Sequence, residues 1–115
     1  MFQEVKDRLP VSGNGYDAQI IGEIKACVLD LTTSAEIELP GNVAISRDPD
    51  TGVITDDSDL EDELIITTIA TWCNMRIGNP PNYDNLLKAY NSLKGQLRLS
   101  KTYTTGREGA PACGF

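Results

Sequence analysis

Residues 58–99 contain two long apolar patterns of helical period, separated by the sequence Gly78-Asn79-Pro80-Pro81. Apolar side chains cover more than half of the circumference of the first segment, which is typical of a central helix buried by several neighbours. Glycine ends helices and proline is tolerated in a first helical turn, so we expect helices over 58–77 and 82–99. The short turn between them predicts a long antiparallel helical hairpin.

The start of the first of these helices is predicted from its polar residues. Ser58 precedes Glu61 by three residues, the arrangement of a capping box that satisfies two backbone donors. Acidic residues are also concentrated around this point, where the positive end of the helix dipole favours them. We therefore expect the helix to begin at Ser58.

Two shorter helices are expected nearer the N-terminus. Residues 2–9 alternate apolar and charged side chains at helical spacing, and Pro10 with the following glycines ends that segment. Residues 16–31 repeat apolar side chains along one helical face, although Gly22 weakens this helix by about 1 kcal/mol relative to alanine.

The pattern changes over residues 36–57, where two short β-prone runs flank Asp48-Pro49-Asp50-Thr51-Gly52. This arrangement predicts a short β-hairpin or an ordered loop that depends on the helices or on a partner for stability. The clustered carboxylates also suit calcium, but glycine stands at the fifth position of the loop rather than the sixth, and glutamate is missing from the twelfth. A solvated turn is the favoured interpretation.

These patterns together predict an all-α fold, a small helical bundle with the long C-terminal hairpin and the short excursion between its second and third helices. At 115 residues the chain has the length of one compact domain, which we place at 1–100. Residues 101–115 have no apolar periodicity and are expected to form an extended tail.

The charge of the chain is strongly polarised along its length. The net charge is −7, and residues 30–63 carry eleven acids with Arg47 as their only base, whereas residues 64–115 carry six bases and two acids. This acidic balance disfavours nucleic-acid binding, which depends on basic side chains that neutralise phosphates. A polarised chain can instead pair its acidic part with the basic part of a neighbouring copy.

The composition argues against catalysis and against a membrane location. The chain has no histidine, and its three cysteines form no CxxC pair. No stretch approaches the roughly 18 apolar residues that a membrane span needs. We predict a protein that is not an enzyme, with no catalytic, cofactor-binding or metal-binding residues.

Two sets of residues are candidates for contacts with partners. The first is a basic and aromatic set near the C-terminus that suits a docking tail, and it comprises Arg98, Lys101, Tyr103, Arg107 and Phe115. The second is an acidic face, and it comprises Asp48, Asp50, Asp56, Asp57, Asp59 and Asp62.

The stretch from Leu64 to Asp84, continuing through Leu87, Leu93 and Leu97-Arg98 to Tyr103, resembles the C-terminal half of head-tail connector proteins of long-tailed bacteriophages. These are also called adaptor or head-completion proteins. In that family a helix with small and apolar side chains leads through a Gly-Asn-Pro type turn into a helix that ends near Leu-Arg. The resemblance covers about half of the chain.

The resemblance implies a structural protein of the virion neck, made in the host cytoplasm and assembled there as a dodecameric ring beneath the portal. Its partners would be further copies of itself, the portal protein, and the next neck or tail-completion protein. DNA would pass through the ring without specific binding, and the acidic face would line the lumen. The alternative is a small helical protein-protein interaction module or a prophage-encoded regulator.

Overall fold

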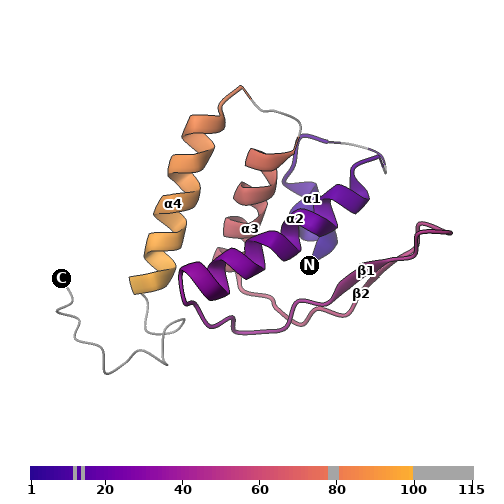
Figure 1. Cartoon of the computed structure of the whole chain (residues 1–115), viewed down its shortest axis with the longest axis horizontal. Coiled ribbons are helices and arrows are strands. Elements are labelled where there is room, and N and C mark those ends of the chain that lie inside the picture. Colours follow the sequence, from indigo (N-terminus) through magenta and orange to yellow (C-terminus); the bar gives the residue numbers. More distant parts are fainter. Residues whose placement is uncertain (12, 14, 78–80, 100–115) are drawn as a thin grey trace.

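The computed structural model describes residues 1–11, 13, 15–77 and 81–99, and most of these residues are helical. This confirms the predicted mostly helical class, with a small antiparallel sheet between the second and third α-helices (Figure 1). The elements in chain order are α1 (Phe2–Asp7), α2 (Asp17–Leu29), the π-helix η1 (Asp30–Ser34), β1 (Ile45–Arg47), β2 (Ile54–Asp56), α3 (Glu63–Arg76) and α4 (Tyr83–Leu99).

Helix α3 is the centre of the bundle, as its apolar circumference predicts. It packs against α1, α2 and α4, and these three helices surround it in Figure 1. Ile65, Ile66, Ile69 and Cys73 on α3 are fully buried. Burial on several sides explains why this helix lacks a single narrow apolar stripe.

The predicted start of α3 at Ser58 is wrong, because the helix begins five residues later. Asp62 is its N-cap and accepts a hydrogen bond from Ile65 N at 3.0 Å, an arrangement that satisfies a free donor of the first turn. The Ser58 hydroxyl instead accepts a hydrogen bond from Ala44 N at 2.9 Å. Ser58 is therefore part of an extended segment, residues 57–60, that pairs with residues 42–44.

The predicted helix over 16–31 is present as α2, which continues into the π-helical turn η1. The hydroxyls of Thr32 and Thr33 donate to the carbonyls of Val28 and Leu29, at 2.8 Å and 2.5 Å. Such side-chain bonds compete with the regular backbone pattern at a helix end. Leu31 in this turn is fully buried, so the turn still contributes to the core.

Residues 45–56 form the predicted hairpin, with Ser46 paired to Thr55 in its antiparallel register. Gly52 has a φ of 76°, a conformation that favours glycine at this turn. The backbone pairing continues before β1 and after β2. Asp57 N donates to Ala44 O at 2.8 Å, and Asp59 N donates to Asn42 O at 3.0 Å. This longer ribbon explains how strands of three residues remain ordered, and it projects from the helices in Figure 1.

Helix α4 lies beside α3 and provides the last wall of the core. The rings of Trp72 and Tyr90 meet edge to face with their centroids 5.2 Å apart, and Tyr90 and Leu97 are buried. Most of the predicted turn between the two helices, residues 78–80, lies outside the described residues, as does the predicted tail 101–115.

Candidate functional site

The acidic residues predicted to share one face lie in three places along the hairpin ribbon. Asp48 and Asp50 lie at the exposed tip, and the Asp48 carboxylate accepts hydrogen bonds from Asp50 N at 2.8 Å and Thr51 N at 3.3 Å. These bonds form the turn that the sequence favoured and hold the pKa of Asp48 below its ordinary value. Among the described residues no cluster of three or more His, Cys, Asp or Glu side chains has the arrangement of a metal site.

Asp56 lies at the base of the ribbon and joins it to α1. Its carboxylate accepts hydrogen bonds from Phe2 N at 2.7 Å and from Ser58 N at 3.1 Å, and the amino nitrogen of Met1 lies 3.0 Å away. Partial burial alone would raise the pKa of Asp56. The hydrogen bonds outweigh that effect and lower the pKa from 3.8 to about 2.

This lowered pKa predicts a loss of stability in acid. The ionised Asp56 stabilises the fold fully above the unfolded-state value near 3.8, and this contribution disappears as the pH falls towards 2. Urea unfolding between pH 5 and pH 2 (roughly the range set by these values) should therefore show a falling free energy of unfolding. Asp56→Asn should be less stable at neutral pH and should reduce this slope.

The slope should not vanish in that variant, because Asp30 also has a lowered pKa. Asp57→Asn is the matched control, since Asp57 is exposed and adjacent in sequence. An Asp56→Asn variant with the same acid slope as the Asp57→Asn control would contradict the role given to Asp56.

The remaining acidic candidates lie within the segment that leads from β2 into α3. Asp57 and Asp59 are exposed, and Asp62 is the partly buried N-cap. The Asp59 side chain also accepts a hydrogen bond from Asn42 N, so it closes the base of the ribbon. Exposed carboxylates thus occur both at the tip and at the base, and several of the acids also hold the backbone in place.

One of the predicted basic and aromatic interface residues lies in the described part of the chain. Arg98 is exposed near the end of α4, next to Leu99, whose side chain is 80% exposed. The other four, Lys101, Tyr103, Arg107 and Phe115, lie outside the described residues.

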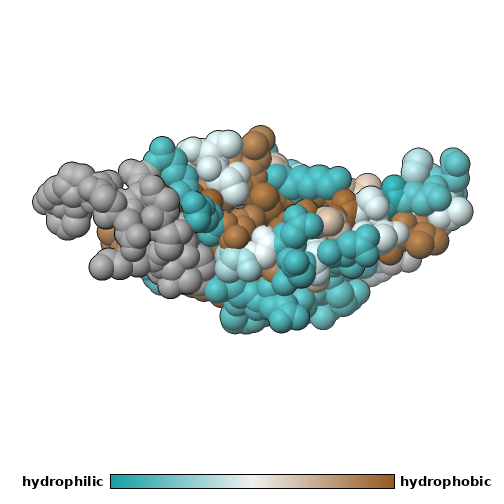
Figure 2. All heavy atoms as spheres, turned by 90° about the horizontal axis from the view of Figure 1, so that it is seen from below, coloured by the Kyte–Doolittle hydropathy of each residue, from teal (hydrophilic) through white to brown (hydrophobic). Residues whose placement is uncertain are grey.

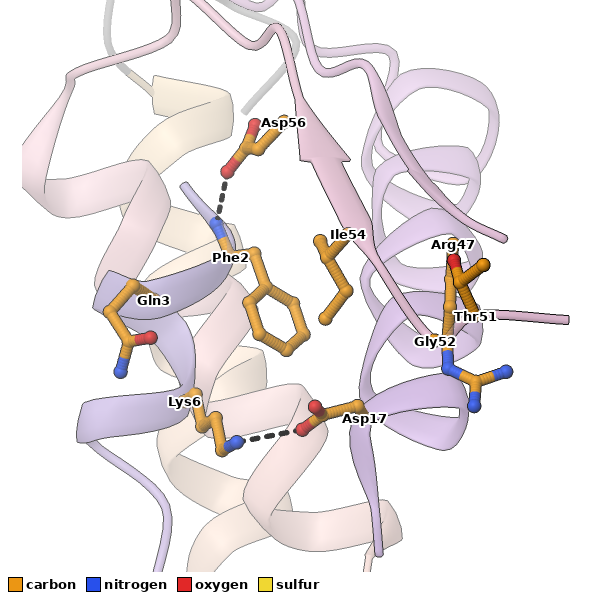
Figure 3. Close-up of a pocket in the computed structure, with 9 residues that line it drawn as sticks. All are labelled: Phe2, Gln3, Lys6, Asp17, Arg47, Thr51, Gly52, Ile54 and Asp56. Atoms are coloured by element: carbon orange, nitrogen blue, oxygen red, sulfur yellow. Dashed lines mark hydrogen bonds and ion pairs between the residues drawn. The ribbon is translucent and has the colours of Figure 1, made fainter. Parts of the chain in front are cut away.

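An open groove of about 660 Å³ separates the ribbon from α1 and the start of α2 (Figure 3). Phe2 and Ile54 form its apolar part, Arg47 lies on the hairpin side, and Lys6 pairs with Asp17 at 2.7 Å on the helical side. Sequence reasoning did not find this groove, because its walls come from three separate segments.

Polar side chains connect α2 to α3 and η1 to α4 on the opposite side of the bundle. Asp30 accepts hydrogen bonds from Tyr90 Oη at 2.6 Å and Lys94 Nζ at 3.0 Å. Glu23 accepts a hydrogen bond from Trp72 Nε1 at 3.0 Å, and the Nε atom of Arg76 lies 3.5 Å from the same carboxylate. These bonds satisfy polar groups at helix contacts, which is a structural task.

The two cysteines that the structure describes are suited to packing rather than to nucleophilic attack. Cys27 and Cys73 are fully buried. Burial raises the pKa of Cys27 to about 12 and also raises that of Cys73. A thiol with such a pKa is protonated at neutral pH, whereas the thiolate is the reactive form.

Comparison of the chain with protein-family models, with curated proteins and with solved structures gave no match. Among the described residues, no helix has both the length and the apolar character that crossing a membrane requires.

Proposed function

We propose that the chain is a structural subunit of a phage head-tail connector. In this proposal, copies form a ring beneath the portal, with twelve subunits as the expected number, and the ring joins the DNA-filled capsid to the tail. The portal protein and the next neck or tail-completion protein are its partners. The virion neck is its location.

The resemblance of residues 64–103 to connector proteins carries this proposal. The helical body around α3 is compatible with it, and so is the close packing of α4 on α3. The proposal includes the finer prediction that α3 and α4 form a long antiparallel hairpin through the Gly78-Asn79-Pro80-Pro81 turn. It assigns a scaffolding role to the chain, with no chemical step.

The charge distribution supports a place beside the DNA channel. Asp57 and Asp59 are exposed at the base of the ribbon, while Arg76, Lys88 and Arg98 are exposed on α3 and α4. Carboxylates that line a channel repel the phosphates of passing DNA, so DNA passes without being bound. We propose that the base of the ribbon faces the lumen and that Arg76, Lys88 and Arg98 face protein partners.

Binding to capsids tests this function. Purified protein carrying a fluorescent label is mixed with DNA-packed capsids that bear a portal, and bound protein is measured after sedimentation. We expect saturable binding at about twelve copies per capsid, the number that the resemblance to connector proteins implies for one closed ring. Capsid shells without a portal are the control. Equal binding to both kinds of particle, or binding to neither, would contradict the proposal.

A further inference from the structure

The two ends of the molecule differ in charge and both expose apolar side chains. One end is the tip of the ribbon, where Asp48, Asp50 and Val53 are exposed, Val53 by 62%. We refer to these three residues as the tip patch. Figure 2 shows hydrophobic atoms among hydrophilic ones on the projecting hairpin. Arg47 directly precedes Asp48 and is also exposed, so the tip presents an exposed valine beside two carboxylates and one base, with a net negative charge.

The other end is formed by the last turns of α2 and α4. Leu29 is 62% exposed there, and Leu99 is 80% exposed. The exposed bases Lys25 and Arg98 come from the same helices, and Lys25 lies one helical turn from Leu29 on the same face. We refer to Lys25, Leu29, Arg98 and Leu99 as the helix-end patch.

Contacts between the helices place the members of the helix-end patch at one end of the bundle. Asp30 directly follows Leu29 and is bonded to Tyr90 and Lys94, so the end of α2 lies beside the second half of α4. In Figure 1 these two helix ends lie side by side, and the tip of the hairpin lies at the far end of the longest axis. The molecule extends 50 Å along that axis.

The opposite charges and the exposed apolar side chains make these two patches complementary. We propose that the tip patch of one copy docks on the helix-end patch of the next copy. Val53 then packs on the exposed leucines of the helix-end patch, while Asp48 and Asp50 face its two bases. Burial of the apolar side chains contributes affinity, and the charges set the orientation of the contact.

This contact joins different surfaces at opposite ends of the subunit, so it is a heterologous contact. Repetition of such a contact closes into a ring when the rotation between copies permits closure. The inference rests on the proposed ring function and names the surfaces that form the ring. It assigns Asp48 and Asp50 to the contact between copies, and leaves the carboxylates at the base of the ribbon for the lumen.

Charge reversal on each patch tests the contact in the protein alone. The tip variant carries Asp50→Lys and Val53→Lys, and it retains Asp48 because that carboxylate holds the turn. The end variant carries Arg98→Glu and Leu99→Glu. Each variant alone then presents like charges at both ends, which repel each other. In a one-to-one mixture, the altered tips can meet altered ends of opposite charge.

Sedimentation velocity at low salt measures the association state of each sample. We expect each variant alone to remain monomeric, and the mixture to show a weight-average mass at least about twice that of the monomer. The associated species should diminish as salt is raised, because screening weakens exposed charge pairs. Circular dichroism melts verify that both variants are folded.

The control is Lys88→Glu, a reversal at another exposed position of α4 that leaves both patches intact. This variant should associate as the wild-type protein does, whereas the end variant alone should not. The proposal is overturned if the tip and end variants stay monomeric when mixed, or if Lys88→Glu alone loses association as fully as the end variant does. If the mixture associates but the wild-type protein does not bind portal-bearing capsids, the proposed function fails and the contact between copies stands.

Discussion

Tyr90→Ala is expected to destabilise the fold by about 3–5 kcal/mol, the largest effect of any substitution proposed for this protein. The ring of Tyr90 is 2% exposed and packs against Trp72, so its removal leaves a cavity between α3 and α4. The substitution also removes one of the two hydrogen bonds that Asp30 accepts from α4. Urea unfolding followed by circular dichroism measures the change in the free energy of unfolding.

Tyr90→Phe separates the two contributions, because it keeps the ring and deletes the hydroxyl. Its cost should be about 1.5–3 kcal/mol at most, the range for a hydrogen bond to a charged group, since Lys94 still pairs with Asp30. If Tyr90→Ala were no less stable than Tyr90→Phe, the ring would contribute nothing to the packing of α4. That result would contradict the burial of Tyr90 between α3 and α4.

Gly41→Ala is expected to destabilise the protein by roughly 1–3 kcal/mol through a clash at the base of the ribbon. A Cβ atom at this position would lie 2.6 Å from Leu60 Cα and 2.9 Å from Leu60 N. Both contacts are with backbone, so a rotamer change cannot relieve them. The paired segments around Asn42 and Asp59 must separate, or the fully buried Leu60 must move.

Gly22→Ala is the matched control for this prediction. Gly22 is an exposed residue within α2, and a Cβ atom added there would meet no atom outside its own helix backbone within 4 Å. Alanine should therefore stabilise the helix by about 1 kcal/mol. Thermal melts of the two variants should shift in opposite directions. A Gly41→Ala variant at least as stable as wild type would refute the close approach of the two segments.

Much of the helical fold could be predicted from the sequence, because its apolar periodicity directly reports which side chains are buried. Local patterns predicted helix α2, the hairpin turn at Asp48 and the central position of α3. The start of α3 did not. Ser58 and Glu61 have the spacing of a capping box, but the Ser58 hydroxyl binds Ala44, fourteen residues away.

The candidate surfaces were predictable only in part, for a related reason. A count of charges along the chain identified the acidic segment, but it did not reveal which carboxylates hold backbone donors. Asp56 and Asp59 accept hydrogen bonds from residues far from them in the sequence, whereas Asp57 is exposed. The sequence does not show that the helices of Leu29 and Leu99 are neighbours. That follows only from the hydrogen bond between Asp30 and α4 in the folded chain.

The connector proposal is tested most directly by electron cryomicroscopy of DNA-packed, portal-bearing capsids after incubation with the purified protein. We expect a ring of helical subunits on the capsid axis beneath the portal, with the base of each ribbon towards the channel. Capsids whose portal vertex is unchanged by saturating protein would contradict the proposal.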